Sequence, residues 1–111
     1  MKVEELTVRE ASKRIAELDV VDVREEDEFH GPLGHIAGAR LLPYDHLEQA
    51  ADQLPRHRPL LIACRTGRRS RMACELLAAL GITSTINLSG GMMAWNDAEL
   101  PVVRRATEES A

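Results

Sequence analysis

The stretch that decides the fold is "LLIACRTGRRSRMACELLAALG", residues 60–81. It opens with an unbroken apolar run, which is typical of a strand buried on both faces. A loop containing Cys64 and Gly67 comes next, and strong helix formers follow, with Ser70 as the expected N-cap and Gly81 as the expected stop. The stretch therefore predicts a strand, a loop and a helix in direct succession.

The remainder of the chain repeats this alternation of strands and helices. Thr7 and Glu10 have the spacing of a capping box, Asp45 is a further expected cap, and residues 25–39 are rich in Gly and Pro and predict an irregular loop. We expect helices over 8–17, 44–54, 70–80 and 90–95, and strands over 19–24, 40–43, 58–64 and 83–89. This order predicts the α/β class, with one domain whose central parallel sheet is flanked by helices on both faces. The domain is expected over residues 1–103, with a frayed tail over 104–111.

Composition limits the classes of function. A chain of 111 residues with 44% apolar residues suits one soluble domain, and the net charge of −4 argues against a general nucleic-acid binder. No apolar run approaches the roughly 20 residues of a membrane span, and the charged start "MKVEEL" does not resemble a signal peptide. We therefore expect a cytoplasmic protein with both cysteines reduced, no membrane contact and no metal site, because the four histidines lack ligand spacing.

The loop after residue 63 gathers positive charge around one thiol. A thiol is a poor nucleophile until it loses its proton, and an unperturbed cysteine has a pKa near about 8.5. The N-terminus of the following helix, the arginines at 65, 68, 69 and 71, and the convergent N–H groups that Gly67 permits are all expected to favour the thiolate of Cys64. The same groups would hold an anionic substrate. The alternative is that Cys64 has no chemical role and is a buried structural cysteine beside a basic surface exposed to solvent.

"CRTGRRS", residues 64–70, resembles the active-site loop of rhodanese-type sulfurtransferases. "DVREEDEF", "GHIAGARLLP" and "LSGGMMAWNDAELPV" are similar to that family's other three signatures, and they stand in the same order over residues 20–102. The chain thus resembles the single-domain thiosulfate sulfurtransferases among the rhodanese-like proteins. The resemblance implies an α/β fold and transfer of a sulfane sulfur through a cysteine persulfide, with no separate cofactor.

The resemblance also implies a role for each matching residue. Cys64 is the expected nucleophile, which would take sulfur from thiosulfate or a similar small anion and pass it to cyanide, a thiol or a protein acceptor. Asp22 and Arg24 would brace neighbouring loops by ion pairing. The substrate loop comprises Arg65, Thr66, Gly67, Arg68, Arg69 and Ser70, with Arg65 and Arg69 as the stronger candidates for holding an oxyanion.

Two departures from the family pattern concern loops. "HGPL", residues 30–33, is about two residues longer than usual, so this loop is expected to bulge toward the mouth of the site. Glu99 stands where a glycine is common, which leaves the conformation of that turn open.

Two other functions remain open. A phosphatase or arsenate reductase of the related fold would need an arginine six positions after the cysteine, where this chain has Ser70. A sulfur-carrier or interaction module that acts on a partner protein would have the same loop and differ only in its acceptor. Cys74 lies in an apolar helical stretch and is expected to pack in the core, and the oligomeric state cannot be read from the sequence.

Overall fold

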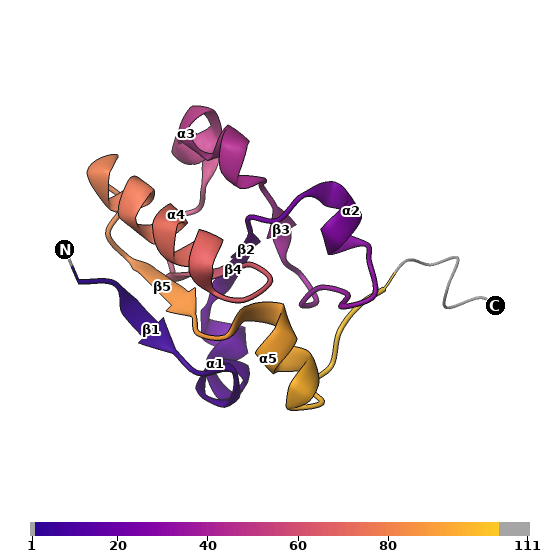
Figure 1. Cartoon of the computed structure of the whole chain (residues 1–111). Helices are drawn as coiled ribbons and strands as arrows, with labels where there is room; N and C mark the ends of the chain where they lie inside the picture. Colours follow the sequence, from indigo (N-terminus) through magenta and orange to yellow (C-terminus); the bar gives the residue numbers. More distant parts are fainter. Residues whose placement is uncertain (1, 105–111) are drawn as a thin grey trace.

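Five parallel strands form the central sheet of the protein, as shown in the computed structural model, which describes residues 2–104 (Figure 1). The spatial order is β1-β5-β4-β2-β3, so β4 lies at the centre of the sheet. All four pairings are parallel, and the carboxyl ends of the strands therefore meet at one edge. The strands are β1 (Glu4–Leu6), β2 (Asp19–Asp22), β3 (Arg40–Leu41), β4 (Leu60–Ala63) and β5 (Thr85–Leu88).

Helices cover both faces of this sheet, which confirms the expected fold class. On one face lie α3 (Leu47–Ala50) and α4 (Arg68–Ala79), and on the other lie α1 (Val8–Arg14) and α5 (Gly91–Asp97). A shorter helix, α2 (Glu26–Phe29), follows β2 at the carboxyl edge. Three 3-10 turns complete the helical segments: η1 (Ile15–Glu17), η2 (Tyr44–His46) and η3 (Ala51–Gln53).

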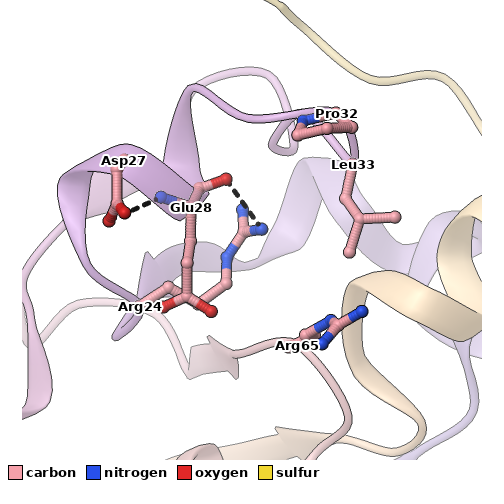
Figure 2. A pocket seen from close by; sticks show the side chains of 6 residues that line it. All are labelled: Arg24, Asp27, Glu28, Pro32, Leu33 and Arg65. Atoms are coloured by element: carbon pink, nitrogen blue, oxygen red, sulfur yellow. Dashed lines mark hydrogen bonds between the residues drawn. The ribbon is translucent and has the colours of Figure 1, made fainter.

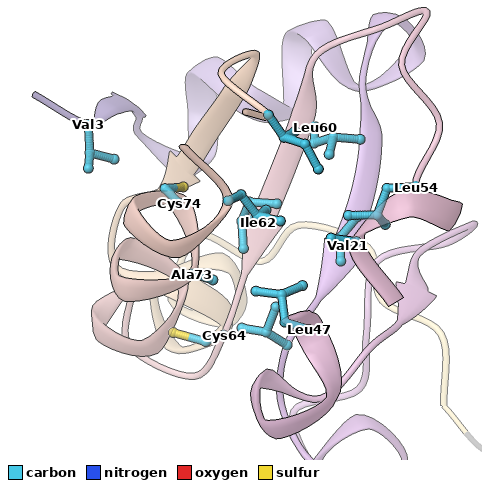
Figure 3. Packing of buried hydrophobic residues seen from close by; sticks show 13 residues of the cluster. Val3, Val21, Leu47, Leu54, Leu60, Ile62, Cys64, Ala73 and Cys74 are labelled. Atoms are coloured by element: carbon cyan, nitrogen blue, oxygen red, sulfur yellow. The ribbon is translucent and has the colours of Figure 1, made fainter. Parts of the chain in front are cut away.

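The central strand supplies side chains to both layers of the core. Leu60 and Ile62 pack on the α3–α4 face with Cys64 (Figure 3). Leu61 and Ala63 pack on the α1–α5 face. All four β4 residues are buried, as expected for a strand covered on both sides. Cys64 thus emerges directly from the most buried strand of the protein.

Two elements were not expected from the sequence. β1 was missed because it is a three-residue edge strand in which Glu4 and Glu5 are exposed, so it has no buried apolar run. The prediction of an irregular loop over 25–39 was wrong at α2, where Glu25 and Glu28 form a reciprocal capping box. A capping box built on glutamate does not carry the usual Ser or Thr signal.

Two expected helix caps were wrong, and one helix end was confirmed. Gly67, in the left-handed region at φ 95°, caps α4, and Ser70 lies within the first turn of that helix. Asp45 lies inside η2 and caps nothing, because the segment 44–53 is divided into a short α-helix between two 3-10 turns. Gly81, at φ 90°, follows the end of α4 as expected.

The last described residues return toward the carboxyl edge. His35 and Val103 form an isolated antiparallel bridge, and the Arg104 Nε donates to the Pro32 carbonyl at 3.1 Å. The remainder of the expected tail, residues 105–111, lies outside the described residues. Within residues 2–104, no helix has both the length and the apolar character needed to cross a membrane.

Candidate active site

The loop that follows β4 brings Cys64 to the carboxyl edge of the sheet, which is where ligands bind in parallel α/β folds. Its turn depends on Gly67, whose φ of 95° is unfavourable for residues with a side chain. A Cβ at Gly67 would also lie 3.0 Å from the Gly90 nitrogen and 3.2 Å from the Leu88 oxygen. The loop therefore packs tightly against the connection between β5 and α5.

The sulfur of Cys64 is surrounded by hydrogen-bond donors. The Gly67 N–H donates to Sγ at 3.1 Å, the Ser70 N–H donates to it at 3.3 Å, and the Ser70 hydroxyl lies 3.2 Å from it. The residue is only 1% exposed, so the sulfur lies beneath the loop and is not an open surface thiol. Donors aimed at one sulfur stabilise negative charge on it, whether as a thiolate or as a persulfide anion.

Asn87 fixes the orientation of the Ser70 hydroxyl. The hydroxyl donates to the Asn87 Oδ1, and the Asn87 Nδ2 donates to the Gly67 carbonyl at 3.1 Å. A hydroxyl has one hydrogen. When the Ser70 hydroxyl donates that hydrogen to Asn87, the neutral Cys64 thiol can donate its own hydrogen to the Ser70 oxygen. Sequence reasoning missed Asn87, although a polar residue in the middle of the buried strand β5 is the signal that could have identified it.

Several backbone N–H groups of the loop have no acceptor within residues 2–104. They belong to the two residues on either side of Gly67, which are Arg65, Thr66, Arg68 and Arg69. The loop N–H groups already aimed at Sγ lie in the same turn. The loop therefore has the donors of an anion nest.

The N-terminus of α5 holds the loop from the other side. The N–H groups of Met92 and Met93 donate to the carbonyls of Cys64 and Arg65 at 2.8 and 2.9 Å. Gly91 permits this approach, because a Cβ there would lie 2.5 Å from both carbonyl oxygens. The glycine pair at 90–91 is thus part of the site's scaffold.

Two of the four loop arginines are paired with carboxylates. Arg69 forms a bidentate ion pair with Glu28, with both N–O distances at 2.8 Å, and Arg71 pairs with Glu5. The Arg69 guanidinium lowers the pKa of Glu28 to about 2, so the carboxylate stays charged. The charge of Arg69 is therefore neutralised by Glu28, and its expected role in holding an anion stays a prediction, whereas Arg65 and Arg68 have no carboxylate partner in the described part of the chain.

Asp22 and Arg24 form a buried ion pair at 2.8 Å, and both side chains are 1% exposed. Arg24 donates further to the Glu28 carbonyl at 3.2 Å and to the Gly34 carbonyl at 2.8 Å. This pair links the end of β2 to α2 and to the following loop, which is the bracing arrangement that the resemblance implies. It lies beneath the site and does not reach the Cys64 sulfur.

A cavity of about 390 Å³ opens beside the loop (Figure 2). The longer segment 30–33 contributes Pro32 and Leu33 to its wall, and Figure 2 shows Leu33 extending toward Arg65. The other lining residues are Arg24, Asp27 and Glu28. A charged loop and a partly apolar wall therefore face the same hollow.

The other candidate residues have structural positions. Cys74 is buried among the side chains beneath α4, and burial raises the pKa of its thiol to about 11 (Figure 3). His35 stacks on Phe29 with ring centroids 3.7 Å apart. Within the described chain, no group of three or more His, Cys, Asp or Glu side chains is arranged to hold a metal ion.

Comparisons with known proteins agree with this geometry. A family model described as "Rhodanese-like domain" matches residues 7–98. A sulfurtransferase of Allochromatium vinosum is 34% identical over 104 residues, covering 91% of this chain and 95% of its own. The thiosulfate sulfurtransferase GlpE of Shewanella oneidensis is 33% identical over 81 residues, covering 73% and 78%. The crystal structure of a rhodanese-related protein of Thermoplasma volcanium superposes with a TM-score of 0.85 at 28% identity, covering 92% of this chain and 99% of that one.

Proposed function

The chain belongs to the rhodanese-like domain family, and from that premise we propose that it is a sulfurtransferase that carries sulfane sulfur on Cys64. The donor in this proposal is thiosulfate or a similar small anion, and the acceptor is cyanide, a small thiol or a thiol on a partner protein. The observation that carries the proposal is the set of N–H donors around Sγ, at 3.1 and 3.3 Å. The sulfur is held covalently by the protein, so the cycle needs no separate cofactor.

In the first half of the cycle, the Cys64 thiolate attacks the outer sulfur of thiosulfate. The new bond joins Sγ to that sulfur, the S–S bond of thiosulfate breaks, and sulfite leaves with the electron pair. The resulting persulfide carries its negative charge on the outer sulfur. The N–H groups of Thr66, Arg68 and Arg69, which have no acceptor within residues 2–104, are available to stabilise that charge.

In the second half, the acceptor attacks the outer sulfur and the Sγ–S bond breaks. The electron pair returns to Sγ, which restores the thiolate, and cyanide leaves as thiocyanate. The Gly67 and Ser70 N–H groups that donate to Sγ stabilise the thiolate as a leaving group. The free thiol that this cycle needs fits a location in the reducing cytoplasm.

Intact-protein mass spectrometry after mixing with thiosulfate, and then with cyanide, tests the proposal. We expect a gain of about 32 Da that maps to Cys64 and disappears with cyanide. Cys64→Ser should show no gain, whereas Cys74→Ser, which removes the other thiol, should behave like the wild type. A folded, reduced protein that gains no mass would overturn the proposal.

The phosphatase alternative receives no support from the loop. The position that would hold the phosphate-binding arginine is Ser70, which is buried against Cys64 and Asn87. A sulfur-carrier role remains within the proposal, because it changes the acceptor and not the chemistry on Cys64.

A further inference from the structure

The cavity beside the loop that follows Cys64, to which Arg65 contributes, has no excess of positive charge. Its charged lining residues are two arginines, Arg24 and Arg65, and two carboxylates, Asp27 and Glu28, so their formal charges cancel. The Arg24 guanidinium is already bound to the buried Asp22. Attraction of an anion into this cavity therefore falls to Arg65 and to the backbone N–H groups of the loop.

Glu28 neutralises the positive charge that Arg69 would otherwise add to this attraction. Both of its oxygens accept from Arg69 at 2.8 Å, so each terminal guanidinium nitrogen of Arg69 directs one N–H group to the carboxylate. The pair joins α2 to the first turn of α4, the helix that follows the Cys64 loop. A donor entering the cavity meets a neutral ion pair where the sequence alone suggested a cation.

The opposite part of the wall is apolar. Pro32 and Leu33 line the cavity, and Leu33 points toward the Arg65 guanidinium (Figure 2). A thiosulfate dianion has no organic group to place against this wall, and it carries one charge more than Arg65 can neutralise. An organic sulfane-sulfur donor with a single negative charge matches both features.

We propose that Glu28 is a specificity-determining residue that turns the site toward monoanionic donors of the type R–SO2–S⁻, with the R group against Pro32 and Leu33. This inference rests on the proposed function and refines its donor. The Cys64 thiolate bonds to the outer sulfur of the donor, the S–S bond breaks, and the sulfinate R–SO2⁻ leaves with the electron pair. Charge and atoms balance without an oxidant or reductant.

The test compares thiosulfate with benzenethiosulfonate, which presents the same outer sulfur with one charge less and an apolar ring. Steady-state kcat/KM is measured for both donors with cyanide as acceptor, in the wild type and in Glu28→Gln. Glutamine can keep the capping box of α2 but cannot form the charged bidentate pair, so Arg69 becomes available to anions. We expect the ratio of kcat/KM for thiosulfate to that for benzenethiosulfonate to rise about tenfold, chiefly through a lower KM for thiosulfate.

Glu5→Gln is the matched control. It breaks the comparable pair with Arg71, but Glu5 does not line the cavity as Glu28 does, so this variant should leave the donor ratio at the wild-type value. Leu33→Ala is a second, independent variant, which should lower kcat/KM for benzenethiosulfonate about threefold or more and leave thiosulfate nearly unchanged. The intrinsic reactivity of each donor cancels in these comparisons between variants.

The outcomes separate this inference from the proposed function. Loading of Cys64 by both donors with a ratio that neither Glu28→Gln nor Leu33→Ala changes would overturn the specificity role alone. Loading by neither donor would overturn the proposed function, and the inference with it. An equal rise of the ratio in Glu28→Gln and Glu5→Gln would assign the effect to net charge and would also overturn the role of Glu28.

Discussion

The two thiols of this protein are both 1% exposed, yet their surroundings differ. Cys74 lies among apolar side chains, and burial raises the pKa of its thiol to about 11, so it stays protonated near neutral pH. Cys64 lies beneath two backbone N–H donors and a hydroxyl. Both cysteines are equally buried, so what distinguishes Cys64, the cysteine proposed to react, from Cys74 is the set of hydrogen-bond donors around its sulfur.

Glu99 is the one described residue other than glycine with a positive φ, at 58°. A side chain in this left-handed region costs roughly 1 kcal/mol, and a β-branched side chain costs more. We predict that Glu99→Gly unfolds at an equal or higher urea concentration than the wild type, and that Glu99→Val is less stable than Glu99→Gly by about 1–2 kcal/mol. Equal midpoints for the two variants would show that this turn carries no backbone strain.

At the scale of elements, the contact of α5 with the Cys64 loop depends on Gly91. An added Cβ would lie 2.5 Å from the Cys64 and Arg65 carbonyl oxygens, so the helix would have to move away. Gly91→Ala should lower the free energy of unfolding by about 2–4 kcal/mol and slow the loading of Cys64, measured by urea unfolding and mass spectrometry.

Gly81→Ala provides the comparison for this variant. Gly81 also has a positive φ, at 90°, but an added Cβ would meet nothing within 4 Å. Gly81→Ala should lower the free energy of unfolding by about 1 kcal/mol, which is the cost of the left-handed backbone conformation alone, and should leave the loading of Cys64 unchanged. Equal costs at the two glycines would contradict the crowding described at Gly91.

The ion pair between α2 and α4 should make part of the stability depend on pH. Arg69 lowers the pKa of Glu28 from 4.5 to about 2, so the pair contributes fully above about pH 4.5 and is lost as the pH falls toward 2. The difference in unfolding free energy between the wild type and Glu28→Gln should therefore be larger at pH 7 than at pH 3, measured by urea unfolding. Glu26→Gln, on the same helix, controls for the loss of a negative charge. If the difference in unfolding free energy between the wild type and Glu28→Gln does not change with pH, the pairing of Glu28 with Arg69 is contradicted.

The elements that the sequence predicted well share one property. The strand β4 is entirely apolar, β2 and β5 each contain adjacent β-branched residues, and α4 is rich in strong helix formers, so local composition was enough to identify them. β1, α2 and the N-cap of α4 were missed or misplaced because each depends on a distant contact or on an unusual cap. The same limit applies to the site: the motif identified Cys64, but the pairs of Glu28 with Arg69 and of Asn87 with Ser70 join residues 41 and 17 positions apart.

At the scale of the whole molecule, β1 (Glu4–Leu6) forms one edge of the sheet. β1 pairs with β5, Val3 is buried in the α3–α4 layer of the core, and Glu5 pairs with Arg71. Deletion of residues 1–6 should lower the free energy of unfolding by about 3 kcal/mol, mostly from the lost burial of Val3 and the lost strand pairing. The exposed Glu4→Ala should stay within about 0.5 kcal/mol of the wild type, and a stable deletion variant would show that β1 is dispensable.

The helix that holds the Cys64 loop also carries the single tryptophan of the chain. Trp95 is 3% exposed, its Nε1 donates to the Pro101 carbonyl at 2.9 Å, and it lies one turn after the N–H groups that bind the loop carbonyls. If the loop moves to accommodate a larger group on the Cys64 sulfur, we expect these hydrogen bonds to move α5 with it, and the environment of the Trp95 indole to change. The protein thus carries an intrinsic fluorophore on the helix that binds the Cys64 loop, and we expect stopped-flow emission to follow the proposed sulfur transfer in real time without a label.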